Sequence, residues 1–186
     1  MIKLSSAEDI ERLYAERGGS TYGEDISQTE HALQCARLAE ADGAPPSLII
    51  AALLHDIGYL VEVDPEGLRP ARDGRHEIVG AKALKGLFGE RVRRPIAMHV
   101  AAKRYLCFKD PAYRRALSRA SQESLALQGG PFDSLKAAAF EHRASWQDAL
   151  ALRRYDDMGK RDELVGGSIA QFTPMMNRLL IGRDRI

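Results

Sequence analysis

The chain contains 186 residues, of which 45% are hydrophobic and 28% are charged, and these values are typical of a soluble globular protein with a sizeable core. The net charge of +1 gives no general electrostatic case for binding nucleic acid or a membrane surface. No apolar stretch has the length needed to cross a bilayer, the N-terminus does not read as a signal peptide, and the two cysteines form no CxxC pattern. We therefore predict a cytoplasmic protein with one domain over residues 1–186 and without a thiolate metal site.

Two capping-box patterns mark the starts of the first helices. Ser5-Ser6-Ala7-Glu8 predicts a first helix, and Gly18 and Gly19 follow its apolar pattern as a stop signal. Ser27-Gln28-Thr29-Glu30 predicts the start of a second helix. This pattern places His31 within the first turns of the second helix.

An uninterrupted apolar run comes next in the chain. Residues 48–54 have no polar face, which predicts a helix buried on every side. The run leads into His55 and Asp56, and we expect Gly58 to end the helix. The loop over residues 61–75 is rich in Pro, Gly, Arg and Asp, and its unusual length makes it a candidate lid or mobile edge.

The remaining apolar patterns are also helical. They predict a helix from His76 to Gly89, a helix that begins near Pro95 and carries His99 and Lys103 on one face, a short helix from Asp110 to Leu117, a helical or irregular stretch over 121–128, a long helix over 133–155, and a final helix over 169–180. Glycine pairs separate the last three segments. Because no stretch predicts a convincing strand, the expected fold class is all-α.

Four of the five histidines lie at or near predicted helix ends, and the ends of bundled helices can converge on one point. Any one of them alone could be a helix cap or a hydrogen-bonded core group, so their joint placement with two aspartates is what favours a metal site. Imidazole and carboxylate ligands suit first-row transition metals, chiefly iron, manganese, zinc or nickel. One tetrahedral ion does not need so many ligands, so Asp56 could bridge two metals. The candidate ligands are His31, His55, Asp56, His76, His99 and Asp156.

The order of His31, the pair His55-Asp56, and Asp156 resembles the H…HD…D pattern of the HD-domain superfamily, whose members are all-helical metalloproteins and mostly phosphohydrolases. The likeness is closer to one branch, the HD-domain mixed-valent diiron oxygenases, and within it to the organophosphonate oxygenases. That branch matches all six candidate ligands and also Lys103. The matching segments are 23–36, 51–58, 76–80, 99–106, 124–130 and 152–160. The resemblance implies an HD-type helical bundle with a dinuclear metal site in its core.

The resemblance also implies a role for each site residue. The ligands of one iron ion would be His31, His55, Asp56 and Asp156, and those of the other would be His76, His99 and the shared Asp56. The residues that match the phosphonate-holding positions are Lys103, Ser121 and Arg153. A phosphonate dianion independently needs cationic donors, and Lys103 and Arg153 lie about one helical turn from proposed ligands. Tyr22 and Glu24 match positions that contact the substrate's amino group, and Lys103 and Tyr59 are the residues outside the metal ligands that we expect to be catalytic.

The implied reaction is cleavage of the carbon–phosphorus bond of a 1-hydroxyphosphonate by dioxygen. The products would be phosphate and glycine from 2-amino-1-hydroxyethylphosphonate, or phosphate and glycine betaine from (R)-1-hydroxy-2-(trimethylammonio)ethylphosphonate. Two departures from the family pattern affect this choice: Tyr59 stands where the family has a histidine, and the segment before Glu24 is one residue shorter. The additional aromatic ring favours the trimethylated substrate through cation–π contact.

Two other functions fit parts of the pattern. An HD-type phosphohydrolase would direct a metal-activated water at the phosphorus of a nucleotide or phosphate ester, and a non-catalytic helical module would keep the ligands as a structural metal site. His76, His99 and Lys103 argue against a mononuclear hydrolase, and the adjoining cationic pocket argues against a binding module. We expect an organophosphonate and dioxygen as partners, no nucleic acid or membrane, and a monomer or small homo-oligomer.

Overall fold

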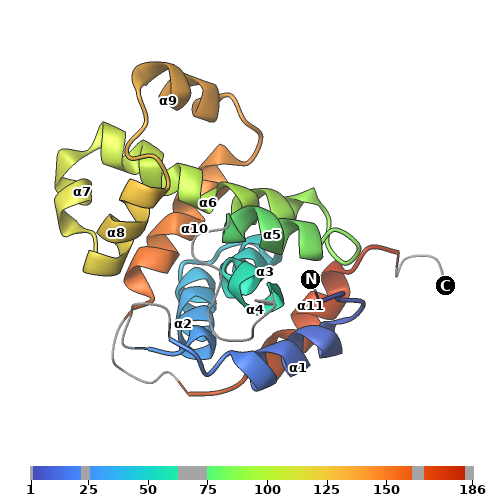
Figure 1. The fold of residues 1–186 in the computed structure, drawn as a ribbon. Helices are drawn as coiled ribbons and strands as arrows, with labels where there is room; N and C mark the ends of the chain where they lie inside the picture. The colour runs from blue at the N-terminus through green and yellow to red at the C-terminus, as the bar shows by residue number, and fades with distance from the viewer. Residues whose placement is uncertain (1, 22–25, 63–74, 161–165, 183–186) are drawn as a thin grey trace.

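A computed structural model describes residues 2–21, 26–62, 75–160 and 166–182, and this part of the chain is helical (Figure 1). Its only β-type pairing is an isolated antiparallel bridge between Phe88 and Leu180, so the all-α prediction is confirmed for these residues. The helices are α1 Ala7–Arg17, α2 Gln28–Ala41, α3 Pro46–Leu54, α4 Ile57–Val61, α5 His76–Ala83, α6 Glu90–Lys109, α7 Pro111–Ala116, α8 Arg119–Leu127, α9 Ser134–Glu141, α10 Trp146–Met158, the 3₁₀ helix η1 Ile169–Phe172, and α11 Thr173–Leu179.

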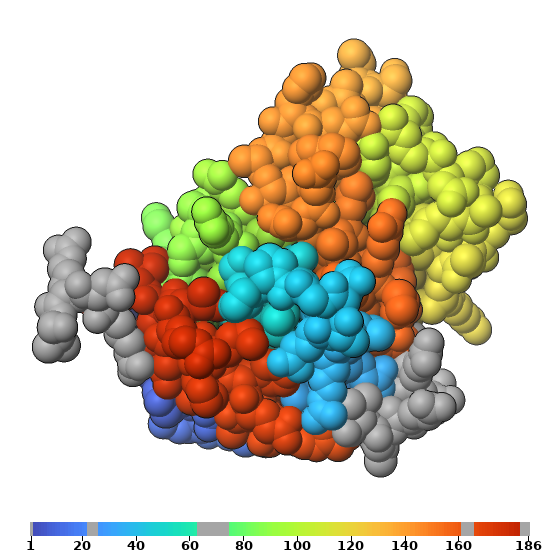
Figure 2. All heavy atoms as spheres, turned by 180° about the vertical axis from the view of Figure 1, so that it is seen from behind, coloured from blue at the N-terminus to red at the C-terminus, as the bar shows by residue number. Residues whose placement is uncertain are grey.

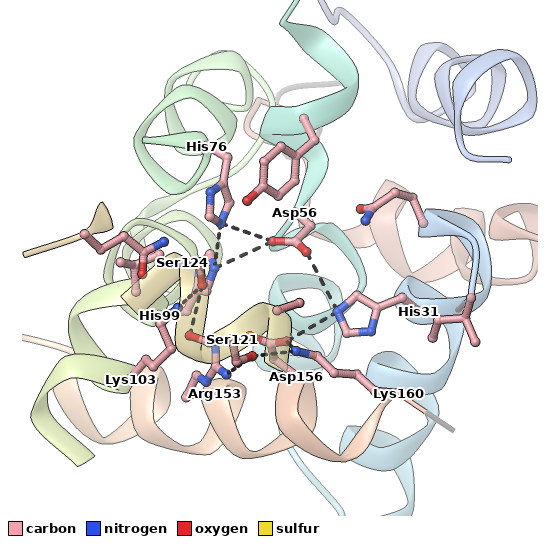
Figure 3. Close-up of a pocket in the computed structure, with 16 residues that line it drawn as sticks. His31, Asp56, His76, His99, Lys103, Ser121, Ser124, Arg153, Asp156 and Lys160 are labelled. Carbon is pink, nitrogen blue, oxygen red and sulfur yellow. Dashed lines mark hydrogen bonds and ion pairs between the residues drawn. The ribbon is translucent and has the colours of Figure 1, made fainter. Parts of the chain in front are cut away.

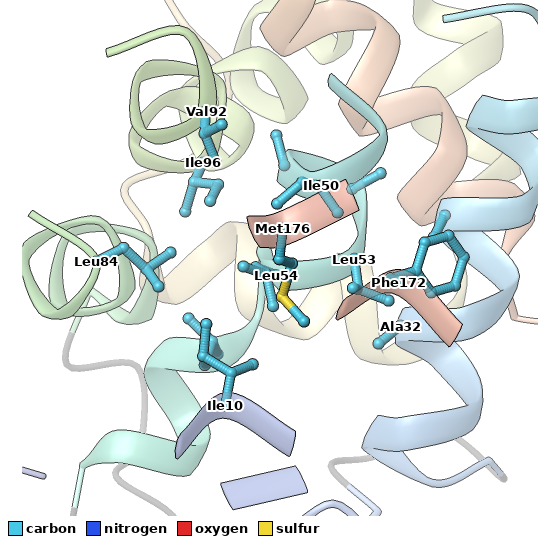
Figure 4. Packing of buried hydrophobic residues seen from close by; sticks show 14 of the residues in the cluster. Ile10, Ala32, Ile50, Leu53, Leu54, Leu84, Val92, Ile96, Phe172 and Met176 are labelled. Carbon is cyan, nitrogen blue, oxygen red and sulfur yellow. The ribbon is translucent and has the colours of Figure 1, made fainter. Parts of the chain in front are cut away.

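Helix α3 is the centre of the fold. All its residues from Leu48 to Leu54 are buried, because α2, α6, α10 and α11 pack around it. Figure 4 shows Ile50, Leu53 and Leu54 among apolar side chains from several of the surrounding helices. The sequence has no polar face here because no side of this helix faces water, as predicted.

A smaller group of helices extends from this central bundle. The C-terminal half of α6 packs with α9 and α10 through an aromatic cluster that includes Tyr105, Phe140 and Trp146. In Figure 1 the helices α7, α8 and α9 lie on the side of the molecule away from α1 and α11, and Figure 2 shows the same separation from behind. None of the helices in the described ranges combines the length and the apolar character that crossing a membrane requires.

Both predicted N-terminal caps are present. The hydroxyl of Ser6 accepts a hydrogen bond from the backbone N–H of Asp9 at 3.2 Å, and that of Ser27 accepts one from Glu30 at 3.1 Å. These bonds satisfy backbone donors that a helix start leaves unpaired. The second cap fixes where α2 begins and therefore places His31 one turn into the helix.

Gly58 does not end the buried helix, contrary to the prediction. Helix α3 ends at Leu54, and Gly58 lies within the short helix α4. A Cβ atom at this position would lie 2.0 Å from the carbonyl oxygen of His76, so the glycine permits the close packing of α4 on α5. The glycine signal was real, but its cause is a tertiary contact.

Three further boundaries also differ from the predictions. Helix α5 ends at Ala83, and Gly89 is the N-cap of α6, which begins at Glu90 and contains Pro95 in its interior. The long helix expected over 133–155 is divided into α9 and α10, because Ser145 adopts a left-handed backbone conformation with φ 66° that an α-helix cannot continue through. The expected lid falls mainly on residues 63–74, which lie outside the described residues.

Candidate metal centre and anion pocket

All six candidate ligands converge on one place in the core. They come from the first turns of α2 (His31), the α3–α4 junction (His55 and Asp56), the start of α5 (His76), the middle of α6 (His99) and the last turns of α10 (Asp156). The four histidines and Asp156 are buried, and the side chain of Asp56 is 17% exposed. Figure 3 shows Asp56 between His31 on one side and His76 and His99 on the other.

One group of ligands faces the Oδ2 atom of Asp56. This oxygen lies 3.4 Å from Nε2 of His55 and 3.8 Å from Nε2 of His31. Oδ1 of Asp156 completes the group at 3.4 Å from His31 and 3.8 Å from His55, and the two Nε2 atoms are 3.2 Å apart. Because metal–ligand bonds to nitrogen and oxygen are about 2.0–2.2 Å long, ligands of one ion lie at about this separation from each other.

The second group faces the other oxygen of the same carboxylate. Oδ1 of Asp56 lies 3.3 Å from Nε2 of His76 and 3.7 Å from Nε2 of His99, and these two nitrogens are 3.1 Å apart. Asp56 thus presents one oxygen to each pair of histidines. This is the geometry expected of a carboxylate that bridges two metal ions.

The outer ring nitrogens orient the imidazoles. The Nδ1 atoms of His31, His55 and His99 lie 2.7–2.8 Å from backbone carbonyl oxygens, those of Gly159, Ala52 and Ile96. A carbonyl only accepts hydrogen bonds, so each Nδ1 carries the proton and each Nε2 directs its lone pair inward. Two such lone pairs about 3 Å apart repel each other unless a proton or a metal ion lies between them, so these donors fit bound cations.

The charges of the site show the same need. Burial opposes protonation of His31 and His55, but Cys35 and Asp156 outweigh it at His31 and raise its pKa to about 10, and Asp56 raises that of His55 to about 9. Burial would raise the pKa of Asp56, yet His55 and His76 hold it well below its usual value. Without metal, protons on the histidines therefore balance the carboxylates. A metal ion would replace these protons.

Cys35 lies directly behind His31. Its Sγ atom is 3.7 Å from Nδ1 of His31 and donates a hydrogen bond to the carbonyl of Tyr155 at 3.4 Å. Burial raises the pKa of this thiol, so it stays protonated and acts as a donor, although its sulfur is close enough to the histidines to be considered as a ligand. The sequence gave no reason to expect the cysteine here.

A cavity of about 100 Å³ adjoins the ligands and carries cationic side chains. The ammonium of Lys103 donates to the hydroxyl of Ser124 at 2.7 Å. The hydroxyl of Ser121 accepts from Arg153 at 3.3 Å and from Lys160 at 3.0 Å. We call these five residues the anion pocket, because their hydrogen-bond donors suit a phosphonate group. Figure 3 shows them below the ligands His99 and Asp156.

Arg153 is held on several sides. It donates to Oδ2 of Asp156 at 2.6 Å, to both carboxylate oxygens of Asp157, and to the hydroxyl of Tyr113 at 3.1 Å. Burial of Asp156 is offset by Arg153 and then by Lys160, which hold the pKa of this carboxyl well below its usual value. Arg153 therefore links the anion pocket to a candidate metal ligand.

The structure brings Lys103, Ser121, Arg153 and Tyr59 together around the cavity. The ring of Tyr59 stacks on that of His76, with 4.2 Å between ring centroids and 16° between planes. Tyr22 and Glu24 lie outside the described residues.

Sequence reasoning did not assign Lys160 and Ser124 to the site, although simple spacings pointed to them. Lys160 follows Asp156 by four residues, and Ser124 follows Ser121 by three.

Comparisons with known proteins give a family for this architecture. Residues 29–165 match the HD domain. The chain is 39% identical over 175 residues, 93% of this chain and 89% of the relative, to the glycine-betaine-forming 1-hydroxy-2-(trimethylamino)ethylphosphonate dioxygenase of Leisingera caerulea. It is 46% identical over 150 residues, 80% of this chain and 75% of the relative, to the hydroxymethylphosphonate dioxygenase of Gimesia maris. A third relative, 37% identical over 162 residues, is an uncharacterised protein of Acanthamoeba polyphaga mimivirus.

Proposed function

This chain belongs to the HD-domain family of phosphonate dioxygenases, and from that premise we propose that it uses dioxygen to cleave the carbon–phosphorus bond of a 1-hydroxyphosphonate. The observation that carries the proposal is Asp56, whose two carboxylate oxygens face two separate pairs of histidines beside the anion pocket. A dinuclear centre and a phosphonate site would thus share one cavity.

We propose that both metal ions are iron. His76, His99 and Asp56 form a set of two histidines and one carboxylate, which leaves positions open on an ion and is the ligand set of non-haem iron oxygenases. His31, His55, Asp156 and the other oxygen of Asp56 would hold the second ion. When bound, iron supplies the redox chemistry that dioxygen activation requires.

In this proposal the side chains of the chain bind and orient the substrate. Lys103 and Lys160 offer ammonium groups to the phosphonate, and the hydroxyls of Ser121 and Ser124 offer further hydrogen bonds. Arg153 is already paired with Asp156 and Asp157, so its main contribution is to fix the pocket relative to the metal ligands. Tyr59 forms the wall next to His76 and limits the space available to the organic part of the substrate.

Three substrates are candidates. The names of the two dioxygenase relatives support a trimethylammonio substrate and hydroxymethylphosphonate, and the resemblance seen in the sequence adds 2-amino-1-hydroxyethylphosphonate. In each case the overall reaction balances with one dioxygen consumed for each phosphate released, the carbon next to phosphorus being oxidised to a carboxylate. No other reductant or oxidant is needed for this balance.

The test is to measure phosphate release and dioxygen uptake together, with iron-loaded and zinc-loaded protein and each of the three substrates. We expect equal amounts of phosphate and consumed dioxygen with iron, and neither with zinc, because zinc is redox-inert. Release of phosphate from a phosphate ester without dioxygen, by either metal form, would show a phosphohydrolase and overturn the proposal. The preferred substrate would show which organic group the Tyr59 wall accepts.

A further inference from the structure

The junction between α3 and α4 carries two adjacent candidate ligands, His55 and Asp56. Because α3 ends at Leu54, the carbonyl groups of its last turn need donors from outside the helix. The ring of His55 itself donates to the carbonyl of Ala52 at 2.8 Å. The conformation of this junction decides where the bridging carboxylate lies, so whatever satisfies the remaining carbonyls also affects the metal centre.

Helix α1 and the residues before it supply donors on both sides of the junction. The hydroxyl of Tyr14 donates to the carbonyl of Leu53 at 3.0 Å, two residues before His55. Arg17 donates to the carbonyl of Leu60 at 3.3 Å, and the backbone N–H of Ile2 donates to that of Val61 at 3.2 Å, both in α4. The N-terminal segment thus holds the two helices whose ends form the junction.

Tyr14 makes its bond inside the core. The side chain is only 3% exposed and packs with the main apolar cluster. Burial raises the pKa of its hydroxyl, which keeps the proton in place for donation. Without this hydroxyl the Leu53 carbonyl would be buried without the Tyr14 donor, and a buried unpaired carbonyl is costly enough to favour a rotated peptide at the helix end.

We propose that Tyr14 is a positioning residue for the metal centre, which holds the α3–α4 junction so that Asp56 can face both pairs of histidines. The inference rests on the proposed dinuclear centre. It assigns a role at this centre to a helix that lies outside the matched HD-domain residues 29–165.

The experiment compares Tyr14→Phe with Tyr105→Phe, which also loses a tyrosine hydroxyl bond, the one to Glu141 at 2.5 Å, away from the ligands. Iron affinity is measured by competition with a chelator. We expect Tyr14→Phe to bind iron about tenfold more weakly, the lower end of the effect usual for residues that support metal ligands, and Tyr105→Phe to bind as the wild type does. With iron saturating, Tyr14→Phe should lower kcat while KM for the phosphonate stays unchanged, because the anion pocket belongs to α6, α8 and the α10 region.

Unchanged iron affinity in Tyr14→Phe, with or without a lower melting temperature, would overturn the inference and leave the tyrosine a structural role only. If Tyr14→Phe does not fold, Arg17→Met removes the donor on the α4 side, and unchanged iron affinity in that variant would equally overturn it. Iron binding is measured without substrate, so a loss in Tyr14→Phe supports the inference even if no phosphonate is turned over. Failure of the wild type to bind iron at all would count against the proposed function and this inference together.

Discussion

Among single residues, Lys103 provides the sharpest electrostatic test of the anion pocket. Burial lowers its pKa to about 8, with the charge of Arg153 as the second cause. A lysine with this pKa is charged below pH 8 and becomes neutral above it, whereas an arginine stays charged throughout. The lysine and its arginine replacement therefore differ in charge mainly on the alkaline side.

We predict that KM for the phosphonate rises as the pH passes 8 in the wild type, and that Lys103→Arg removes this rise. Lys103→Met should raise KM by about 10- to 100-fold at neutral pH, since a hydrogen bond to a charged group contributes about 1.5–3 kcal/mol. The measurement is KM as a function of pH. Lys109→Met, which removes an exposed lysine paired with Glu141, is the matched control and should leave the profile unchanged. A KM in Lys103→Met equal to that of the wild type would remove Lys103 from the proposed site.

The ligand residues could be predicted because their chemistry is rare and their order is characteristic. Histidine and aspartate at the ends of apolar runs had few explanations other than a metal site, and the structure brings the six together. The serines could not be assigned in the same way. Whether Ser121 or Ser124 meets Lys103 depends on the rotation of α8 against α6, and the structure gives Lys103 to Ser124 and Ser121 to Arg153 and Lys160.

At the level of elements, the crossing of α4 and α5 determines how His76 meets Asp56. A Cβ on Gly58 would lie 2.0 Å from the His76 carbonyl oxygen, and one on Gly80 would lie 3.1 Å from the backbone nitrogen of Gly58. The two helices therefore touch through backbone atoms, which cannot move aside as a flexible side chain can. The distance between His76 and the bridging carboxylate depends on this contact.

We predict that Gly58→Ala destabilises the protein by roughly 1–3 kcal/mol, the usual cost of an overpacked core, and weakens metal binding at the His76 side. Chemical denaturation and iron titration measure the two effects. Gly86→Ala is the control, because an added Cβ there meets nothing within 4 Å. Equal stability and equal iron binding in Gly58→Ala and Gly86→Ala would show that the close crossing is not needed.

Element types were predictable from apolar spacing, and the boundaries that failed have tertiary causes. The long apolar pattern over 133–155 continues through residues 142–145, so periodicity alone could not show that Ser145 turns the chain between α9 and α10. Likewise, Gly58 resembles a helix stop until the neighbouring backbone of His76 is known. Local sequence carries the propensity, whereas these two positions are decided by segments distant in the chain.

For the whole molecule, the metal centre joins five helices that the apolar core alone does not tie to one point. Ligands from α2, the α3–α4 junction, α5, α6 and α10 would meet at the ions. Metal binding should therefore stabilise the entire bundle and not one element. The helical class and the central position of α3 were predictable from the sequence, whereas the placement of α7, α8 and α9 beside the bundle was not, since their short amphipathic patterns fit several packings.

We predict that iron(II), added without oxygen at 100 times its dissociation constant, raises the melting temperature by about 5–10 °C. This follows from a stabilisation of about 2.7 kcal/mol and a shift of about 2–4 °C per kcal/mol for a domain of this size. Thermal unfolding followed by circular dichroism measures it. His31→Ala should show a smaller shift, whereas His142→Ala, which alters a histidine outside the site, should behave as the wild type. No shift in the wild type would contradict a centre that spans the bundle.

The most direct measurement of the central claim is the number of iron ions retained per chain after anaerobic loading and gel filtration. A carboxylate shared between two histidine pairs predicts two ions in the wild type, one in His99→Ala, and fewer than one in Asp56→Ala, because the bridge serves both positions. Two ions retained in Asp56→Ala, or only one in the wild type, would contradict the dinuclear centre on which the proposed dioxygenase rests.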